Sequence, residues 1–301
     1  MVKTRIVLLG ATGMLGHKIF QGLELQFPGI RATMRGALTS GALRHVTLLN
    51  RGNVIEGVDV MDFESLRKVL EEVRPEVVVN AVGMIKQRSE AVSAIPSITV
   101  NALFPHRLAD LLARWNGRLI HFSTDCVFSG RRGGYSETDV SDAEDLYGRS
   151  KYLGEVIAPN AVTLRTSIIG RELAEHRSLL DWFLSKHGGR VRGFRKVVYS
   201  GVTTNEMAKV VGMLISDHRN LSGLFQVVSE PITKYALLGL VREAYGLQVE
   251  IDPDDTEVSD RSMRGDKFRA ATGYVAPSWR DLVGALVSDE TPYAEWGTSV
   301  L

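Results

Sequence analysis

A tyrosine and a lysine four residues apart, Tyr147 and Lys151, are the first candidates for chemistry in this chain. In a helix, residues i and i+4 lie one above the other, so the phenol and the ammonium would share one small volume. A nearby ammonium favours the phenolate and lowers the pKa of tyrosine from its ordinary value of about 10. The pair therefore indicates an acid that protonates a carbonyl oxygen during reduction, with a solvated surface pair as the alternative.

Hydroxyl side chains end the apolar stretch that precedes this pair. The segment RLIHFSTD, residues 118–125, has the composition of a buried strand whose polar end reaches the carboxyl edge of a sheet. Ser123 or Thr124 is therefore expected to donate a hydrogen bond to the same carbonyl oxygen as charge develops on it. Lys151 is also placed to hold a nicotinamide ribose.

Three glycines stand between the first apolar run and the first segment of helical period. The stretch GATGMLG spaces them three residues apart. Glycine permits a tight turn and lets backbone amides approach a pyrophosphate, while the helix N-terminus stabilises the anion. This spacing is common by chance in a chain with 29 glycines, but its position predicts a dinucleotide site, with a plain turn as the alternative. The residues expected to line the site are Gly10, Thr12, Gly13, Met14, Leu15 and Gly16.

The end of the second predicted strand distinguishes two nicotinamide cofactors. Folds that prefer NAD carry an acidic residue there, which accepts from the ribose 2′-hydroxyl. Here the residue is Arg35, and an arginine suits a 2′-phosphate, so the sequence favours NADP(H) over NAD(H). A solvated loop arginine is the alternative. Asp59 and Val60 follow at the predicted end of the third strand, where an adenine ring would lie.

Short apolar runs rich in β-branched residues alternate with longer segments of helical period. This alternation predicts an α/β Rossmann fold, a doubly wound parallel sheet of about seven strands with helices on both faces. The predicted strands cover 5–9, 30–34, 76–83, 118–125, 161–167 and 223–229, with another ending at 58–62; the predicted helices include 13–26, 63–73 and 101–115.

The later part of the chain breaks this rhythm, which predicts a smaller C-terminal α/β lobe that binds the substrate. The Rossmann domain is assigned residues 1–167, with its last strand returning at about 199–229. The substrate lobe is assigned 168–198 and 230–301. Within that lobe EPITKYALLGLVREAYG predicts an amphipathic helix and DPDD a polar loop.

Charge and cysteine content exclude several classes of function. The 36 Lys and Arg nearly balance the 35 Asp and Glu, so no net field draws the chain to nucleic acid or to an anionic membrane. A single cysteine excludes an intramolecular disulfide and a cysteine-built zinc site, and no metal is expected. The first apolar run ends at Leu9 without a cleavage site. We expect a cytoplasmic protein without a membrane span.

The motifs taken together resemble those of a known superfamily. GATGMLGH, FSTDCVFSG, YGRSKYLGE and LRTSIIG, and more loosely VVYSGVTTNEMAKVV and ATGYVAPSW, resemble the extended short-chain dehydrogenases/reductases. The most similar branch is the dTDP-4-dehydrorhamnose reductase family, the RmlD-like sugar-nucleotide-binding proteins. The resemblance implies hydride transfer from NAD(P)H to the keto group of a nucleotide-activated deoxysugar, and a homodimer formed through the helix bearing Tyr147. It implies Thr124, Tyr147 and Lys151 as the catalytic set.

Further residues are expected near the cofactor or the sugar nucleotide. Ala81, Val82 and Gly83 end a predicted strand, and Lys86 with Gln87 follows in a loop that either touches nicotinamide or sugar or is solvated. Asn101 begins a predicted helix and is either its cap or, by the resemblance, a residue near the active site. Asp125 is a further candidate for substrate contact. The arginines that either bind the diphosphate or are simply solvated are Arg165, Arg192, Arg195 and Arg261.

The chain departs from the family pattern at Cys126, where the family usually has tyrosine, and at the stretches GMIKQ and SGVTTNEM. These departures do not affect the residues of the expected chemistry, but the identities of the sugar and of its nucleotide do not follow from the sequence. The related GDP-fucose synthases resemble this stretch and carry a cysteine there that acts in epimerisation. Cys126 is therefore interpreted either as an epimerase thiol with His176 as its partner acid or as a small packed hydrophobic residue.

The prediction from sequence is an NAD(P)H-dependent reductase of a nucleotide-linked 4-keto-6-deoxy sugar that serves surface polysaccharide synthesis. Tyr147 gives the proton, Lys151 supports it and binds the ribose, and Thr124 orients the carbonyl. One alternative is an epimerase/reductase or epimerase/dehydratase that uses Cys126 and His176. Another is a non-catalytic regulatory subunit, because one RmlD-like branch serves methionine adenosyltransferase as a partner protein.

Overall fold

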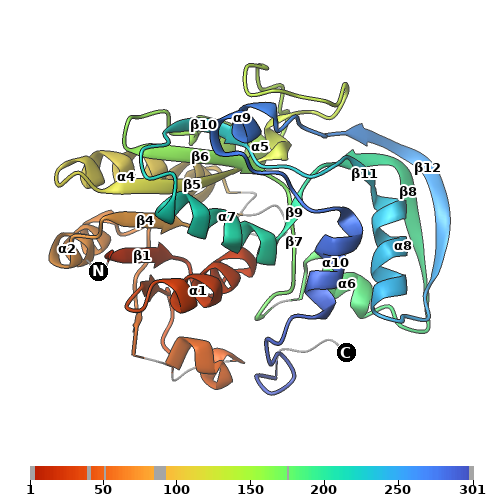
Figure 1. Cartoon of the computed structure of the whole chain (residues 1–301), viewed down its shortest axis with the longest axis horizontal. Helices are drawn as coiled ribbons and strands as arrows, with labels where there is room; N and C mark the ends of the chain where they lie inside the picture. Colours follow the sequence, from red (N-terminus) through yellow and green to blue (C-terminus); the bar gives the residue numbers. More distant parts are fainter. Residues whose placement is uncertain (1–3, 39–41, 51, 85–92, 175, 298–301) are drawn as a thin grey trace.

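A computed structural model describes residues 4–38, 42–50, 52–84, 93–174 and 176–297 (Figure 1). Its central feature is a seven-stranded sheet in the order β10-β6-β5-β4-β1-β2-β3, in which every neighbouring pair is parallel. The predicted doubly wound Rossmann fold is confirmed. The strands are β1 (Ile6–Leu9), β2 (Arg31–Thr33), β3 (Val54–Ile55), β4 (Val77–Asn80), β5 (Arg118–Thr124), β6 (Ala161–Thr166) and β10 (Gly223–Gln226).

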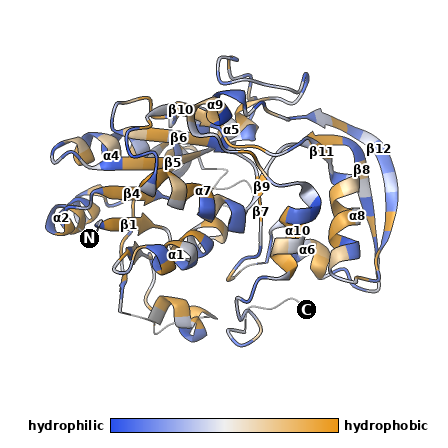
Figure 2. Ribbon diagram, viewed as in Figure 1, coloured by the Kyte–Doolittle hydropathy of each residue, from blue (hydrophilic) through white to orange (hydrophobic). Residues whose placement is uncertain are grey.

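Both faces of this sheet are covered, so its strands are apolar throughout rather than alternating. On β1, Ile6 and Leu8 join a core with helices α1 (Met14–Gln26) and α7 (Thr204–Ser216). Val7 and Leu9 point to the opposite core, under α2 (Phe63–Val73) and α4 (Phe104–Ala113). Successive side chains of a strand face opposite sides, which explains why all four residues are buried. Figure 2 shows the central strands coloured mostly as hydrophobic.

A second, three-stranded sheet lies beside the first, in the order β11 (Ile232–Thr233), β8 (Arg190–Tyr199), β12 (Glu250–Asp260). The helices α6 (Leu179–Leu184), α8 (Lys234–Ala244) and α10 (Trp279–Val287) share a third core with it. The predicted amphipathic helix is confirmed as α8, whose Leu237, Leu238 and Val241 are buried. The remaining elements are η1 (Ala42–His45), η2 (Thr47–Asn50), α3 (Ala94–Ser97), η4 (Ile98–Leu103), η5 (Asp125–Val127), α5 (Leu146–Leu153), β7 (Ile168–Ile169), β9 (Val202–Thr203) and α9 (Asp266–Thr272).

The prediction of a polar loop at DPDD is wrong, because these residues lie within β12. Strand β12 runs parallel to β8 at the edge of its sheet. Its carboxylates pair with the arginines of β8, including Arg192 with Asp254 at 3.1 Å. Cross-strand pairs of opposite charge stabilise such a ladder, and an edge strand tolerates the missing N–H of Pro253.

Two predicted boundaries also differ from the structure. The helical segment around Asn101 begins at Ala94, and α3, the π-helical η4 and α4 follow one another without a break. Asn101 therefore lies inside a helix and is not its cap. Pro105 has no N–H to donate to the carbonyl of Asn101, which fits the wider π turn there. The third strand ends at Ile55 rather than near 58–62.

No helix in the described ranges is both long and apolar enough to cross a bilayer.

Candidate active site

The carboxyl ends of β1 and β4 border the point where the strand order of the large sheet reverses. In open α/β sheets such a switch point is where ligands bind. Gly10, directly after β1, has φ +89°, and a Cβ there would lie 2.9 Å from Cγ2 of Val82. Ala81 and Val82, which follow β4, lie against the glycine turn, whereas Gly83 lies near the Asn101 side chain.

The glycine turn brings the start of α1 close to the end of β1. A Cβ on Gly16 would lie 1.9 Å from the carbonyl oxygen of Gly10, so only glycine lets α1 begin this close to the strand. The first turn of α1 runs from Met14 to His17 and carries no acidic side chain. Partly buried Thr12, Met14 and Leu15 complete the turn. The turn, its position and the helix N-terminus fit a dinucleotide phosphate.

The residues predicted for the adenosine end lie at the same edge of the sheet. Arg35 is exposed directly after β2, and the Val58 N–H donates to the Met34 carbonyl at 3.0 Å, which brings the two loops together. The Asp59 carboxylate accepts from the N–H of Met61 at 2.9 Å, and Val60 is buried.

Helix α5 carries Tyr147 and Lys151 into this region because two glycines let it pack closely. Asp145 caps the helix by accepting from the Gly148 N–H at 2.8 Å. A Cβ on Gly148 would lie 2.2 Å from the carbonyl oxygen of Cys126, and one on Gly154 would lie 1.8 Å from that of Asn101. Helix α5 is thus wedged between η5 and the π-helical turn.

The Thr124 hydroxyl is the centre of the candidate site. It donates to Oδ1 of Asp125 at 3.0 Å and accepts from the Cys126 N–H at 3.1 Å, and it lies near enough to the Tyr147 phenol to affect the pKa of that group. The structure therefore brings together four predicted site residues. Burial raises the pKa of Tyr147 above its ordinary value, and the neighbouring Cys126 and Asp125 add to this increase while the Thr124 hydroxyl opposes it.

Lys151 lies deep in the protein, with only 6 % of its surface exposed. Its Nζ donates to the carbonyl oxygen of Phe122 on β5 at 2.6 Å. Burial lowers the pKa of Lys151 to about 8, and Glu155 opposes the shift. The expectation that Lys151 lowers the pKa of Tyr147 is wrong for this arrangement, because burial of the phenol dominates.

Asn101 links the cofactor side of the site to α5. Its side chain accepts from the Met84 N–H at 2.8 Å and donates to the Met84 carbonyl at 3.0 Å. Its Nδ2 also donates to Oγ of Ser150 at 3.2 Å, and Ser150 in turn donates to the Tyr147 carbonyl at 3.0 Å. The π-helical turn that presents Asn101 is a feature often found at functional sites.

Two predicted diphosphate ligands are engaged elsewhere. Arg165 is 2 % exposed and forms a double hydrogen bond with Glu155, at 2.6 and 2.7 Å. Ser123 also donates to this carboxylate, at 2.7 Å. The structure therefore argues against Arg165 as a substrate ligand. Glu155, which was not predicted from the sequence, joins β5, β6 and the end of α5. Arg195 lies on β8 and pairs with Asp255.

The charge of Arg261 acts on the site, where it opposes the rise that burial causes in the pKa of Asp125. Its Nε donates to the Phe128 carbonyl at 3.0 Å. Nδ1 of His176 lies 3.5 Å from a carboxylate oxygen of Asp181. Lys86 and Gln87 lie outside the described residues.

Comparison with known proteins now decides the family. The family model described as the RmlD substrate binding domain matches residues 4–291. The chain belongs to the RmlD family. The resemblance read from its motifs is thereby confirmed.

Its relatives in the RmlD family carry two kinds of name. A dTDP-4-dehydrorhamnose reductase of Aggregatibacter actinomycetemcomitans is 25 % identical over 194 residues, which are 59 % of this chain and 64 % of that protein. The methionine adenosyltransferase 2 subunit beta of Danio rerio is 26 % identical over 260 residues, 81 % of this chain and 74 % of that protein. Family membership therefore leaves both an enzyme and a subunit role open.

Solved structures support the RmlD fold. A dTDP-4-dehydrorhamnose reductase from Bacillus anthracis, solved in complex with NADP, superposes with a TM-score of 0.79 at 18 % identity, covering 95 % of this chain and 99 % of that one. A reductase of the same name from Clostridium acetobutylicum has a TM-score of 0.77 at 19 % identity, covering 95 % and 99 %.

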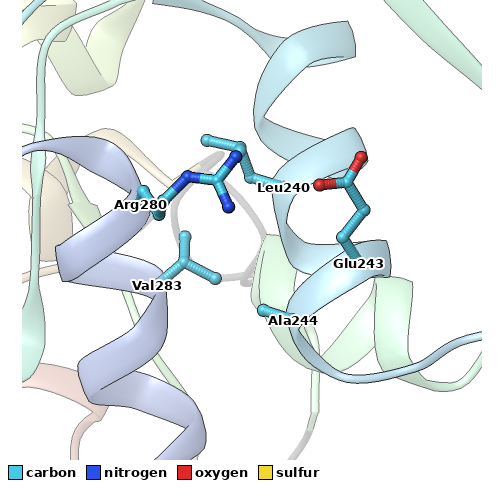
Figure 3. A pocket seen from close by; sticks show the side chains of 5 residues that line it. All are labelled: Leu240, Glu243, Ala244, Arg280 and Val283. Atoms are coloured by element: carbon cyan, nitrogen blue, oxygen red, sulfur yellow. The ribbon is translucent and has the colours of Figure 1, made fainter.

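A separate pocket of about 160 Å³ lies between α8 and α10 (Figure 3). It is lined by Leu240, Glu243, Ala244, Arg280 and Val283, and none of these residues lies on an element that carries the candidate site.

Proposed function

We propose that this protein is an NADPH-preferring reductase of a nucleotide-linked 4-keto-6-deoxy sugar. The observation that carries the proposal is the placement of the Thr124 hydroxyl beside the buried Tyr147 phenol, next to a glycine turn suited to a dinucleotide. Such an arrangement presents two hydroxyl groups to one substrate oxygen. The reductase names of several relatives support the same reaction class.

The side chains present can account for the protonation half of such a reduction. When bound, a reduced nicotinamide would supply the hydride to the carbonyl carbon. Tyr147 donates its proton to the carbonyl oxygen, which completes the alcohol, and its raised pKa keeps that proton in place until charge develops there. Thr124 donates a second hydrogen bond to the same oxygen. Lys151, with a pKa of about 8, is a cation at neutral pH that stabilises the resulting phenolate.

The proposal extends to cofactor preference, substrate lobe and assembly. Arg35 would pair with the 2′-phosphate of NADPH, and residues 168–198 and 230–301 would hold the sugar nucleotide. Exposed apolar side chains on α3, η4, α5 and the residues just after α5 support a homodimer formed around α5, because an exposed apolar surface favours a partner. They are Ile95, Ile98, Leu103, Leu153 and Ile157. A cytoplasmic location is proposed with these.

A regulatory subunit is the second candidate function. The observation that favours it is the match to a methionine adenosyltransferase beta subunit over 81 % of this chain. For the epimerase alternative, Cys126 lies beside Thr124 and His176 contacts Asp181.

The test is the loss of reduced nicotinamide absorbance with NADPH or NADH and 4-keto-6-deoxy sugars on dTDP, UDP and GDP, beside Tyr147→Phe. We expect turnover with one nucleotide, reduced by about 10² to 10⁴-fold in the variant because the acid is lost. No turnover on the whole panel by a protein that binds NADPH would overturn the reductase. Co-purification with a larger enzyme would then favour the regulatory subunit.

A further inference from the structure

The chain after α10 returns to the Rossmann sheet and packs beside α1 (Figure 1). Residues 289–296, named here the C-terminal strap, place Tyr293 and Trp296 in the core shared by α1 and β1, each 4 % exposed. The family match ends at residue 291, so both aromatic residues lie beyond it. The strap therefore begins inside the matched region, at Asp289 to Thr291, and its two aromatic residues follow that region.

A buried ion pair holds the start of the strap. Lys18 on α1 donates to both carboxylate oxygens of Asp289, at 2.9 and 2.8 Å, and to Oγ1 of Thr291 at 2.8 Å. The Lys18 and Asp289 side chains are only 7 % and 11 % exposed. Separating such a pair would leave charge uncompensated in the interior, so the strap is held firmly against α1.

The middle of the strap reaches the glycine turn through one histidine. His17 is fully buried, with Nε2 at 2.9 Å from the Tyr293 hydroxyl and Nδ1 at 2.9 Å from the Gly13 carbonyl oxygen. A carbonyl only accepts, so Nδ1 carries the proton, and burial lowers the pKa of His17 to about 4, which keeps the ring neutral. Nε2 therefore accepts from the Tyr293 hydroxyl.

The chain of hydrogen bonds from Tyr293 through His17 to Gly13 orients the backbone that would face a phosphate. The Gly13 carbonyl accepts from both the N–H and the ring of His17. Because C=O and N–H point in opposite directions in a trans peptide, holding this carbonyl toward the helix directs the Met14 N–H toward the mouth of the turn. An N–H aimed in this way is the group that binds phosphate at a helix start.

The end of the strap is hydrogen-bonded to η2. The Trp296 indole N–H donates to Oγ1 of Thr47 at 3.1 Å. Thr47 lies on η2, in the segment that follows Arg35 and β2. Tyr293 is also contacted by Arg171, whose guanidinium lies 4.4 Å from the ring centre.

We propose that the C-terminal strap is a built-in part of the dinucleotide site, and that Tyr293 and Trp296 are positioning residues for the adenosine and diphosphate half of the cofactor. Tyr293 acts through His17 on the glycine turn, and Trp296 acts through Thr47 on the segment after Arg35. This inference rests on the proposed use of NADPH, but it does not depend on which sugar is reduced.

The experiment is an equilibrium titration of NADPH binding by fluorescence, with the full chain and without sugar substrate. Tyr293→Phe keeps the buried ring and removes only the hydroxyl. We expect the Kd for NADPH to rise about tenfold, the effect of one buried hydrogen-bond partner left unmatched. The matched control is Tyr245→Phe, because the Tyr245 hydroxyl has no hydrogen-bond partner in the described structure, and its Kd should not change.

A second variant and a stability measurement separate positioning from general support. Trp296→Phe keeps an aromatic ring but loses the bond to Thr47, and should weaken NADPH binding more than NADH binding. Unchanged NADPH affinity in both strap variants, with only a lower Tm, would overturn the proposal, as would a folded wild type that binds neither dinucleotide. If NADPH binding depends on the strap but no keto-sugar is turned over, the proposed role of the strap would be supported and the proposed reductase activity would be rejected.

Discussion

The hydroxyl of Thr124 at the end of β5 donates to Oδ1 of Asp125 at 3.0 Å, beside the Tyr147 phenol on α5. Burial raises the pKa of Tyr147 and keeps the phenol protonated, while the neighbouring Thr124 hydroxyl opposes this rise. A substrate oxygen that replaces Asp125 as the acceptor of the Thr124 hydrogen bond would also lie next to the Tyr147 hydroxyl.

Thr124→Val should lower kcat by about 100-fold, because one donor to the developing oxyanion is lost while the shape of the side chain is kept. NADPH affinity should stay near that of the wild type. Steady-state kinetics with a separate binding titration checks both. Thr124→Ser, which keeps the hydroxyl, is the control, and wild-type kcat in Thr124→Val would remove Thr124 from the mechanism.

The buried ammonium of Lys151 should lower the free energy of unfolding of this protein. Its pKa falls from the ordinary 10.5 to about 8, so between these pH values the unfolded chain binds more protons than the folded one. The free energy of unfolding therefore rises with pH across this window, and below about pH 8 the cost of the buried charge is fully present.

Lys151→Met should accordingly increase the free energy of unfolding at pH 7 by about 1–3 kcal/mol, with a smaller gain near pH 10. Urea unfolding at both pH values measures this. Lys209→Met is the control, because the Lys209 side chain is 68 % exposed. A variant that is less stable than the wild type at pH 7 would show that the bond to Phe122 outweighs the burial of the charge.

Gly154→Ala should disrupt the packing of α5 against the π-helical turn. The added Cβ would meet the Asn101 carbonyl oxygen at 1.8 Å, and relief of this clash should lower the free energy of unfolding by about 2–3 kcal/mol. Because α5 carries Tyr147, turnover should fall as well. Gly239→Ala on α8 is the matched control: nothing lies within 4 Å of its Cβ, so it should stabilise the helix by about 0.5–1 kcal/mol. Equal stability of the two variants would contradict this account.

Arg35→Ala should raise the Kd for NADPH about tenfold through loss of a charge-assisted bond to the 2′-phosphate, with little change for NADH. Titration of both cofactors measures the difference. Arg31→Ala is a suitable control, since Arg31 is exposed at the start of β2, away from the glycine turn. An equal effect of Arg35→Ala on both cofactors would mean that Arg35 does not read the phosphate.

Local patterns in the sequence determined the parallel sheet, the glycine turn and the pairing of Tyr147 with Lys151. Apolar period, glycine spacing and i, i+4 geometry depend on residues a few positions apart, so they can be read without a structure. The sequence does not indicate that Asn101 lies inside a helix, because the bonds that hold its side chain, to Met84 and Ser150, come from other parts of the chain.

Only the tertiary structure decided which charged and polar side chains meet in the interior. The sequence suggests that Arg165 binds a phosphate, but in the structure Arg165 on β6 is hydrogen-bonded to Glu155. His17 and Tyr293 are separated by 276 positions, and nothing in the local pattern of either residue indicates that they share a hydrogen bond. The physical reason is that burial and partner choice depend on how the chain packs over its whole length, whereas strand and helix formation depend largely on near neighbours.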